Sequence, residues 1–145
     1  MCIRDSTDAD NKSIPVFIGS YGIGVSRLMG VLVEKYADDK GLIWPEAVAP
    51  FKAHIIPIAK EDEEAYSQAK ELYETLKNTG VTVLFDDRVD MRVGQRLGDA
   101  DLLGMPWRIV VGQKSLDNGG FEVQKRSEED SKIMTSDEIL TLLTT

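Results

Sequence analysis

Residues 94–111 read GQRLGDADLLGMPWRIVV and contain a clear boundary between a helix and a strand. Its first ten residues predict a short helix over Gly94–Leu103. Gly104 and Pro106 end that helix, because glycine readily takes the left-handed conformation found after helix ends and proline cannot continue a helix. Trp107–Val111 is apolar and rich in β-branched residues, which is typical of a buried strand. The sequence therefore predicts a helix followed directly by a strand.

The same alternation extends to both sides of this stretch. We expect strands over His54–Ala59, Val81–Phe85 and Gly120–Lys125, a helix over Glu61–Asn78 that ends at Gly80, and a last helix capped by Ser136. Strands that alternate with helices favour an α/β fold. Residues 53–145 are therefore predicted to form a mixed, mostly parallel sheet flanked by helices.

The first 52 residues are organised differently. Residues 1–13 are polar and lack periodicity, so we interpret them as disordered or as a foreign leader. Residues 14–18 predict a short apolar strand, and Val25–Tyr36 carries apolar residues at three- and four-residue spacing, which predicts an amphipathic helix. Residues 41–52 hold two prolines and predict a connection between domains.

Composition limits the functions that the chain can have. With 42% hydrophobic and 29% charged residues in 145, the chain is predicted to be globular. Its net charge of −8 argues against a general nucleic-acid binder. Residues 86–126 nevertheless hold seven basic and seven acidic residues, which leaves 10 basic and 18 acidic residues elsewhere. Any RNA site must therefore be local and depend on contacts to bases.

The content of cysteine and histidine excludes further kinds of site. The single cysteine, Cys2, excludes an internal disulfide framework, and the single histidine, His54, argues against a zinc site. The longest apolar runs are far shorter than a membrane span. No export signal precedes the helix, so we expect a cytoplasmic protein without a membrane partner and without a metal ligand set.

One motif carries recognisable chemistry. Residues 19–27 read GSYGIGVSR, in which closely spaced glycines lead into a helix. Gly22 and Gly24 would let the backbone approach a ligand closely, and Arg27 lies in the first helical turn, where a phosphate is favoured. The motif lacks the Gly-Lys-Ser/Thr ending of a Walker A loop and the third glycine of a dinucleotide fingerprint. On spacing alone, a tight turn with a surface arginine is the favoured interpretation.

Residues 22–28, GIGVSRL, resemble motif 3 of the class II aminoacyl-tRNA synthetases, and residues 19–27 are similar to the form found in bacterial-type prolyl-tRNA synthetases. The similarity continues in order through residues 41–51, 83–88 and 98–112. This resemblance implies that residues 14–40 are a strand–helix remnant at the end of an antiparallel catalytic domain. Residues 41–52 would then be the linker and residues 53–145 the anticodon-binding domain.

The resemblance also implies roles for single residues. Arg27 would contact the phosphates of ATP, and Gly22 and Gly24 would let the backbone lie against its adenosine. Mg²⁺ would accompany the ATP, with its ligands outside this chain. The full-length enzyme would be a homodimer that activates proline with ATP and transfers it to tRNA-Pro. This chain alone would be inactive, because most of that catalytic domain is absent.

In the C-terminal domain the implied task is reading the anticodon. Proline anticodons end in two guanines, whose edges suit a carboxylate and a basic side chain. Asp101 and Lys114 flank the strand Trp107–Val111 and are the expected pair. The further candidates are Leu97 for an apolar contact to a base, and Arg88 and Arg96 for a base or a phosphate.

Structural interpretations of the same residues stay open. Residues 86–88 can form a turn whose charges pair internally, and Asp101 can be a solvated helix residue. We expect Trp107 and His54 to be structural. Two other functions also stay open: a class II synthetase of the threonyl, glycyl or histidyl type, and a non-catalytic, anticodon-like RNA-binding module.

Overall fold

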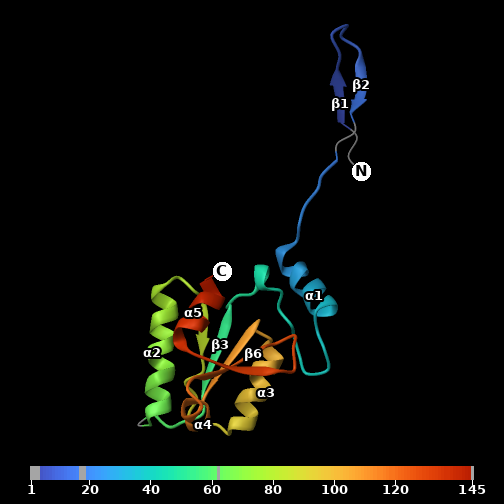
Figure 1. The fold of residues 1–145 in the computed structure, drawn as a ribbon. Helices are drawn as coiled ribbons and strands as arrows, with labels where there is room; N and C mark the ends of the chain where they lie inside the picture. Colours follow the sequence, from blue (N-terminus) through green and yellow to red (C-terminus); the bar gives the residue numbers. More distant parts are fainter. Residues whose placement is uncertain (1–3, 17–18, 62, 145) are drawn as a thin grey trace.

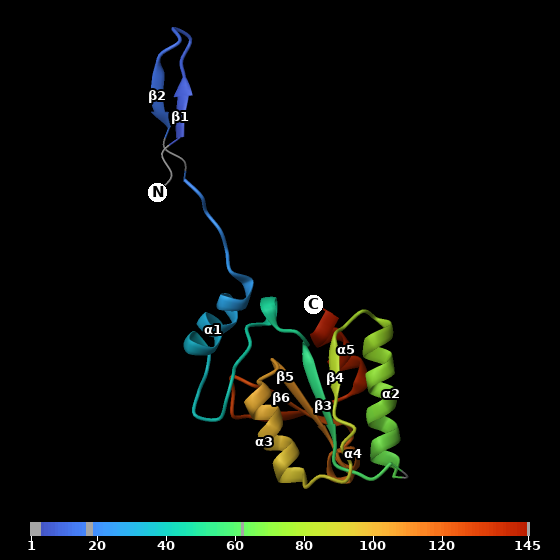
Figure 2. The same cartoon turned by 180° about the vertical axis from the view of Figure 1, so that it is seen from behind.

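The computed structural model describes residues 4–16, 19–61 and 63–144. Residues from 53 onward form an α/β domain. The N-terminal residues form a hairpin that stands apart from this domain in both views (Figures 1 and 2). Residues 19–24 lead without a helix or strand into helix α1 (Val25–Lys35), which lies beside the domain.

Five strands form the sheet of the domain, in the order β4-β3-β5-β6-β7. They are β3 (Ala53–Pro57), β4 (Val83–Phe85), β5 (Trp107–Val111), β6 (Phe121–Lys125) and β7 (Ser131–Met134). β3 pairs in parallel with β4 and β5, whereas the pairs β5–β6 and β6–β7 are antiparallel. The mixed α/β sheet is confirmed. Two of its four pairings are antiparallel, so the expectation of a mostly parallel sheet is corrected to an evenly mixed one.

The two faces of the sheet are covered differently. Helices α2 (Glu64–Asn78) and α5 (Ser136–Thr144) pack on one face and build the core with alternate strand residues such as Ile55, Ile109 and Val123. Helix α3 (Val93–Leu103) contacts β3 on the opposite face. Because strand side chains alternate between faces, Arg108 and Gln124 point to the side of α3.

The ends of the helices follow from local chemistry. α3 ends at Gly104, whose φ of +68° is the left-handed conformation that favours glycine. α5 begins differently from expectation: the backbone N–H of Thr135 donates to the Glu138 carboxylate, and Ile139 N–H donates to Thr135 O. Thr135 rather than Ser136 therefore caps this helix. A short helix, α4 (Gln113–Asp117), follows β5, and a 3₁₀ turn, η1 (Glu46–Val48), lies in the linker.

The N-terminal residues correct one expectation. Residues 1–13 were expected to be disordered or a foreign leader, whereas β1 (Arg4–Thr7) and β2 (Ser13–Val16) form an antiparallel hairpin. Its turn forms because Asp8 Oδ1 accepts the backbone N–H groups of Asp10 and Lys12. The apolar strand expected over residues 14–18 reaches Val16, and its last two residues lie outside the described part.

Helix α1 is confirmed, and none of its side chains is buried. Its apolar residues face solvent, including Leu28, Met29 and Val33. Across the described residues, no helix has both the length and the apolar character that crossing a membrane requires.

Candidate functional site

The glycine-rich motif leads directly into α1. Gly24 is the N-cap of the helix, and its carbonyl accepts the N–H groups of Arg27 and Leu28 at 3.1 Å each. Arg27 is exposed, and its guanidinium has no hydrogen bond or ion pair within the described part of the chain. Its charge lies in the first turn of a helix, where an anion gains most from the helix dipole.

The glycines of this motif have free space around them. A Cβ added at Gly22 would meet nothing within 4 Å, and one at Gly24 would meet only the Cβ of Arg27 at 3.5 Å. Neither residue has the positive φ that would demand glycine. Packing among the described residues therefore gives no reason for glycine at either position.

A second cluster lies where the end of α3 meets β5 and β6. Arg108 Nη1 donates to Asp101 Oδ1 at 2.6 Å, and Arg108 Nη2 donates to Gln124 Oε1. Gln124 Nε2 donates in turn to the backbone carbonyls of Glu128 and Glu129. Both members of the ion pair are about a quarter exposed, at 22% for Arg108 and 28% for Asp101. The cluster therefore offers a guanidinium and a carboxylate side by side at the surface.

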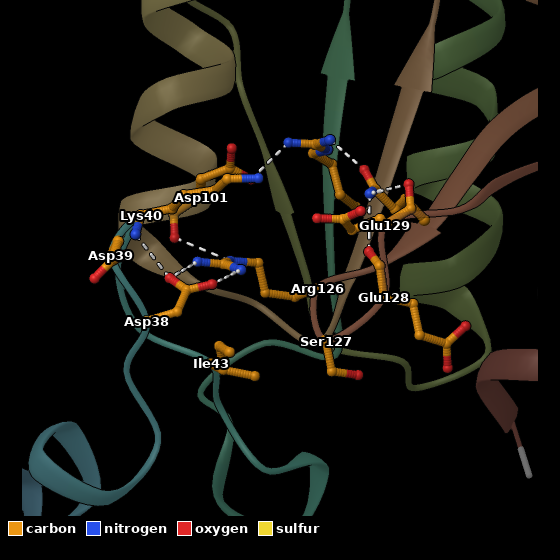
Figure 3. Close-up of a pocket in the computed structure, with 11 residues that line it drawn as sticks. Asp38, Asp39, Lys40, Ile43, Asp101, Arg126, Ser127, Glu128 and Glu129 are labelled. Carbon is orange, nitrogen blue, oxygen red and sulfur yellow. Dashed lines mark hydrogen bonds and ion pairs between the residues drawn. The ribbon is translucent and has the colours of Figure 1, made fainter.

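These residues line a pocket of about 400 Å³ (Figure 3). Its other walls come from residues 38–40, from Ile43 and from the loop after β6, where Arg126 lies between Asp38 and Asp101. A guanidinium donates in a planar fork and a carboxylate accepts at two oxygens, so the pair can exchange its internal bonds for bonds to one planar polar ligand. Asp101 was expected here and Arg108 was not. Strand alternation could have indicated Arg108: its neighbours Trp107 and Ile109 face the core, so Arg108 lies on the face of β5 away from the core.

Arg88 and Arg96 surround a different carboxylate. Asp86 Oδ2 accepts from Arg96 Nε at 3.1 Å and Asp86 Oδ1 accepts from Arg88 Nε at 3.0 Å, while Arg88 Nη1 also donates to Asp99 at 2.7 Å. Burial by itself raises the pKa of Asp86, but the hydrogen bonds from Arg88 and Arg96 outweigh it and lower this pKa to about 2. The alternative in which the charges of residues 86–88 pair internally is therefore what the structure contains.

Arg96 requires a correction. It is 1% exposed, and its guanidinium also donates to the carbonyls of Pro57 at 2.8 Å and Asp86 at 2.7 Å. The expected contact from Arg96 to a base or a phosphate is wrong for this fold, because the side chain holds β3, β4 and α3 together. Arg88 keeps a side-chain exposure of 40% and stays a candidate.

Asp101 and Lys114 are not brought together. Asp101 contacts Arg108 near the start of β5, whereas Lys114 lies in α4, after its end. Both views place α4 at the end of the sheet where α3 begins, away from the last turn of α3 (Figures 1 and 2). Leu97 is half-buried one turn before Asp101. The expectation of a paired Asp101 and Lys114 is therefore corrected.

His54 and Trp107 have structural positions. His54 is 2% exposed in β3, and burial lowers its pKa to about 4. Trp107 packs against the core, with the Lys125 ammonium 5.5 Å from the centre of its ring. In the described residues, no three acidic, cysteine or histidine side chains are grouped so that they could hold a metal ion.

Comparison with known proteins identifies the family of this chain. A family model described as "Anticodon binding domain" matches residues 52–145, which is more than half of the chain. A proline–tRNA ligase of Ruegeria sp. is 45% identical over 130 residues, which cover 90% of this chain and 29% of that protein. The resemblance to prolyl-tRNA synthetases is thereby confirmed.

Two further relatives carry the same name. The proline–tRNA ligase of Brachyspira hyodysenteriae is 43% identical over 133 residues, covering 92% of this chain and 23% of that protein. That of Sulfurihydrogenibium sp. is 48% identical over 119 residues, covering 82% and 21%. The chain thus spans only 21% to 29% of the length of these three relatives. By its match over residues 52–145, the chain belongs to the anticodon-binding domain family.

Proposed function

We propose that this chain is the C-terminal part of a proline–tRNA ligase and recognises the anticodon of tRNA-Pro. The observation that carries the proposal is the family match over residues 52–145, together with relatives named proline–tRNA ligase that align with 82% to 92% of the chain. The net charge of −8 means that affinity comes from contacts to bases rather than from attraction to phosphates.

The pocket beside Asp101 and Arg108 is the proposed base-reading site. A carboxylate accepts from the N1–H and N2–H groups of guanine, and a guanidinium donates to its O6 and N7. Both side chains are partly exposed and already oriented by each other. Leu97 would add an apolar contact to a base from the preceding turn of α3. Arg88 and Lys114, which lie farther along the domain, would contact the backbone of the same anticodon loop.

Residues 14–40 are proposed to be the end of a catalytic domain that binds ATP. Arg27 supports this, because it is an exposed cation in the first turn of a helix and has no partner within the described residues. Gly22 and Gly24 support it as well, since nothing around them requires glycine and a ligand lying against the backbone would. The residues present therefore fit a phosphate and an adenosine.

The remaining parts of the enzyme are proposed to lie outside these residues. Mg²⁺ would balance the charge of the ATP phosphates, and we assign it no ligand here. Proline binding and the contacts of a homodimer would also belong to the rest of the ligase, which would act in the cytoplasm. We expect no proline-dependent exchange of pyrophosphate into ATP from this chain alone.

Binding to two tRNA transcripts tests the proposal. One transcript carries a proline anticodon, and the other differs only by uridine in place of its last guanine, which makes a threonine anticodon. We expect the chain to bind the proline transcript more tightly. Asp101→Asn and Arg108→Lys should each reduce this preference by about tenfold, since a good base contact contributes about 1–3 kcal/mol of discrimination.

The matched control is Glu74→Gln, which changes an exposed charge on α2, away from the pocket. It should leave the preference unchanged, and thermal unfolding should show that all variants are folded. Equal binding of both transcripts by the unaltered chain would refute anticodon recognition.

A further inference from the structure

Residues 36–45 connect α1 to the domain, and we call them the joint. The joint folds back on itself: Ile43 N–H donates to Tyr36 O at 2.6 Å, and Asp38 N–H donates to Gly41 O at 2.9 Å. Asp38 Oδ1 accepts the N–H groups of Lys40 and Gly41 at 2.9 Å each. The joint is thus a closed turn with its own hydrogen bonds.

Backbone contacts fasten the joint to the end of α3. Leu42 N–H donates to Leu102 O at 3.2 Å, and Trp44 N–H donates to Gly104 O at 3.0 Å. Leu42 itself is 9% exposed. These bonds satisfy carbonyl groups that the last turn of a helix leaves free.

Two glycines allow this contact. A Cβ at Gly104 would lie 1.6 Å from Leu42 O, and a Cβ at Gly41 would lie 2.4 Å from Leu102 Cα. Both residues also have positive φ, at +68° and +150°. No side chain fits between the two backbones, so the joint and α3 can approach this closely only because both glycines are present.

An ion pair closes the joint from the other side. Arg126 Nη1 and Nη2 donate to the two carboxylate oxygens of Asp38 at 2.8 Å each, and Arg126 Nε donates to Asp101 O at 3.1 Å (Figure 3). The hydrogen bond from Arg126 lowers the pKa of Asp38, and the bond to Asp38 raises that of Arg126. Arg126 has a side-chain exposure of 7%, so one bidentate arginine joins β6, α3 and the joint.

We propose that the joint is rigid, and that Asp38 and Arg126 are positioning residues that hold α1 in one direction relative to the domain. Residues 41–52 were expected to be an ordinary linker, but the first part of this segment is packed. The direction of α1 determines the position of Arg27. Arg126 also donates to the backbone carbonyl of Asp101, and the side chain of Asp101 binds Arg108. On the proposed function, the joint therefore fixes the nucleotide-contacting helix relative to the base-reading pocket.

The distance between α1 and α2 tests rigidity without any RNA. Spin labels at Glu34→Cys on α1 and Glu71→Cys on α2, in a chain that also carries Cys2→Ser, report it by pulsed electron paramagnetic resonance. Both label positions are exposed. The unaltered joint should give one narrow distribution, and Asp38→Asn and Arg126→Gln should each widen it. A wide distribution for the unaltered joint would overturn the proposal.

Amide exchange supplies a second measurement on the same variants. The amides of Leu42 and Trp44 should exchange about tenfold faster or more in both variants, while β5 and α2 keep their protection, because only the joint opens. Asp38→Glu keeps the charge and should restore part of this protection, which a loss of fold would not allow.

The matched control is Glu46→Gln, which removes a more exposed ion pair of 3.9 Å between Glu46 and Lys125 at the same end of β6. This variant should keep both the narrow distribution and the protection. Equal widening by Glu46→Gln would show that Asp38 and Arg126 have no special role. All of these outcomes are independent of tRNA binding, so a failure of the joint and a failure of anticodon recognition are separate results.

Discussion

Gly22 and Gly30 in the N-terminal arm (residues 4–16 and 19–35) have different surroundings from Gly104 and Gly120 in the packed domain. In the arm, a Cβ at Gly22 or Gly30 would meet nothing within 4 Å. In the domain, a Cβ at Gly104 would overlap Leu42 O, and one at Gly120 would lie 2.4 Å from Met134 O. Gly104 and Gly120 are therefore needed for the packing of the domain itself. Gly22 and Gly30 show no such need, so any requirement for glycine at these two positions comes from a ligand or from protein outside the described residues.

Side-chain burial shows the same difference. In the domain a charged residue such as Arg96 is 1% exposed, whereas in α1 an apolar residue such as Val25 is 80% exposed. The domain satisfies its buried charges internally, and the arm leaves its apolar surface uncovered. Substitutions in the two regions test this contrast.

The largest effect should come from Arg96→Met. Removing this guanidinium leaves the buried carboxylate of Asp86 with one arginine and leaves Pro57 O without its donor. Losing one partner of a buried ion pair typically costs about 3–5 kcal/mol of unfolding free energy, measured by urea denaturation. Arg92→Gln, at the exposed start of the same helix, should change this free energy by less than about 0.5 kcal/mol. Similar effects from the two variants would contradict the structural role of Arg96.

His54 should make the domain sensitive to mild acid. Its imidazole is neutral in the fold, with a pKa lowered to about 4 mainly by burial, whereas the unfolded chain takes up the proton near pH 6.5. Unfolding is therefore favoured as the pH falls from 6.5 toward 4, by up to about 3 kcal/mol. His54→Leu should flatten the dependence of unfolding free energy on pH in this window. His54 is the only histidine, so an unchanged slope in the variant would refute this assignment.

Gly104→Ala should have an intermediate effect. A non-glycine residue with positive φ costs about 1–3 kcal/mol, and the added methyl group must also push Leu42 away. We expect a lower midpoint of thermal unfolding and faster exchange of the Leu42 amide. Gly80→Ala is the control, because Gly80 has a positive φ of +84° but a Cβ there would meet no atom within 4 Å. This variant should lower the midpoint of thermal unfolding without faster exchange of the Leu42 amide.

The smallest effect should come from Gly22→Ala and Gly24→Ala. Both positions have space for a methyl group, so the unfolding free energy of the chain should stay within about 0.5 kcal/mol of its original value. Denaturation by urea measures this directly. A loss above about 1 kcal/mol, twice that limit, would show that the chain itself needs these glycines.

The sequence predicted those elements of the fold that have a strong local signal. β5 was expected over the residues where it is found, and α3 was placed within one residue of its start, because Gly104 and Pro106 mark the boundary between them. β7 was missed because Ser131–Met134 is short and mostly exposed, so alternation of apolar residues is weak there. Its pairing with β6 depends on contacts that no local pattern shows.

The candidate site was predicted only in part, and the reasons are geometric. Asp101 and Lys114 flank one strand in the sequence, but residues that flank a five-residue strand lie at its opposite ends, about 15 Å apart. Arg96 is charged in the sequence like any surface arginine, and only the fold brings Asp86 and Pro57 O to it. Arg108 could have been found from strand alternation, whereas Arg126 and Asp38 are 88 residues apart and meet only in three dimensions.

The joint has a consequence for how this protein can be divided. The family match begins at residue 52, yet Leu42 and Trp44 already bond to the end of α3. A shortened protein that starts at residue 52 would expose Gly104 and Arg126 and would lose the wall of the Asp101 pocket that residues 38–40 and Ile43 form. The smallest autonomous unit should therefore begin near Tyr36, sixteen residues before the boundary that sequence families give.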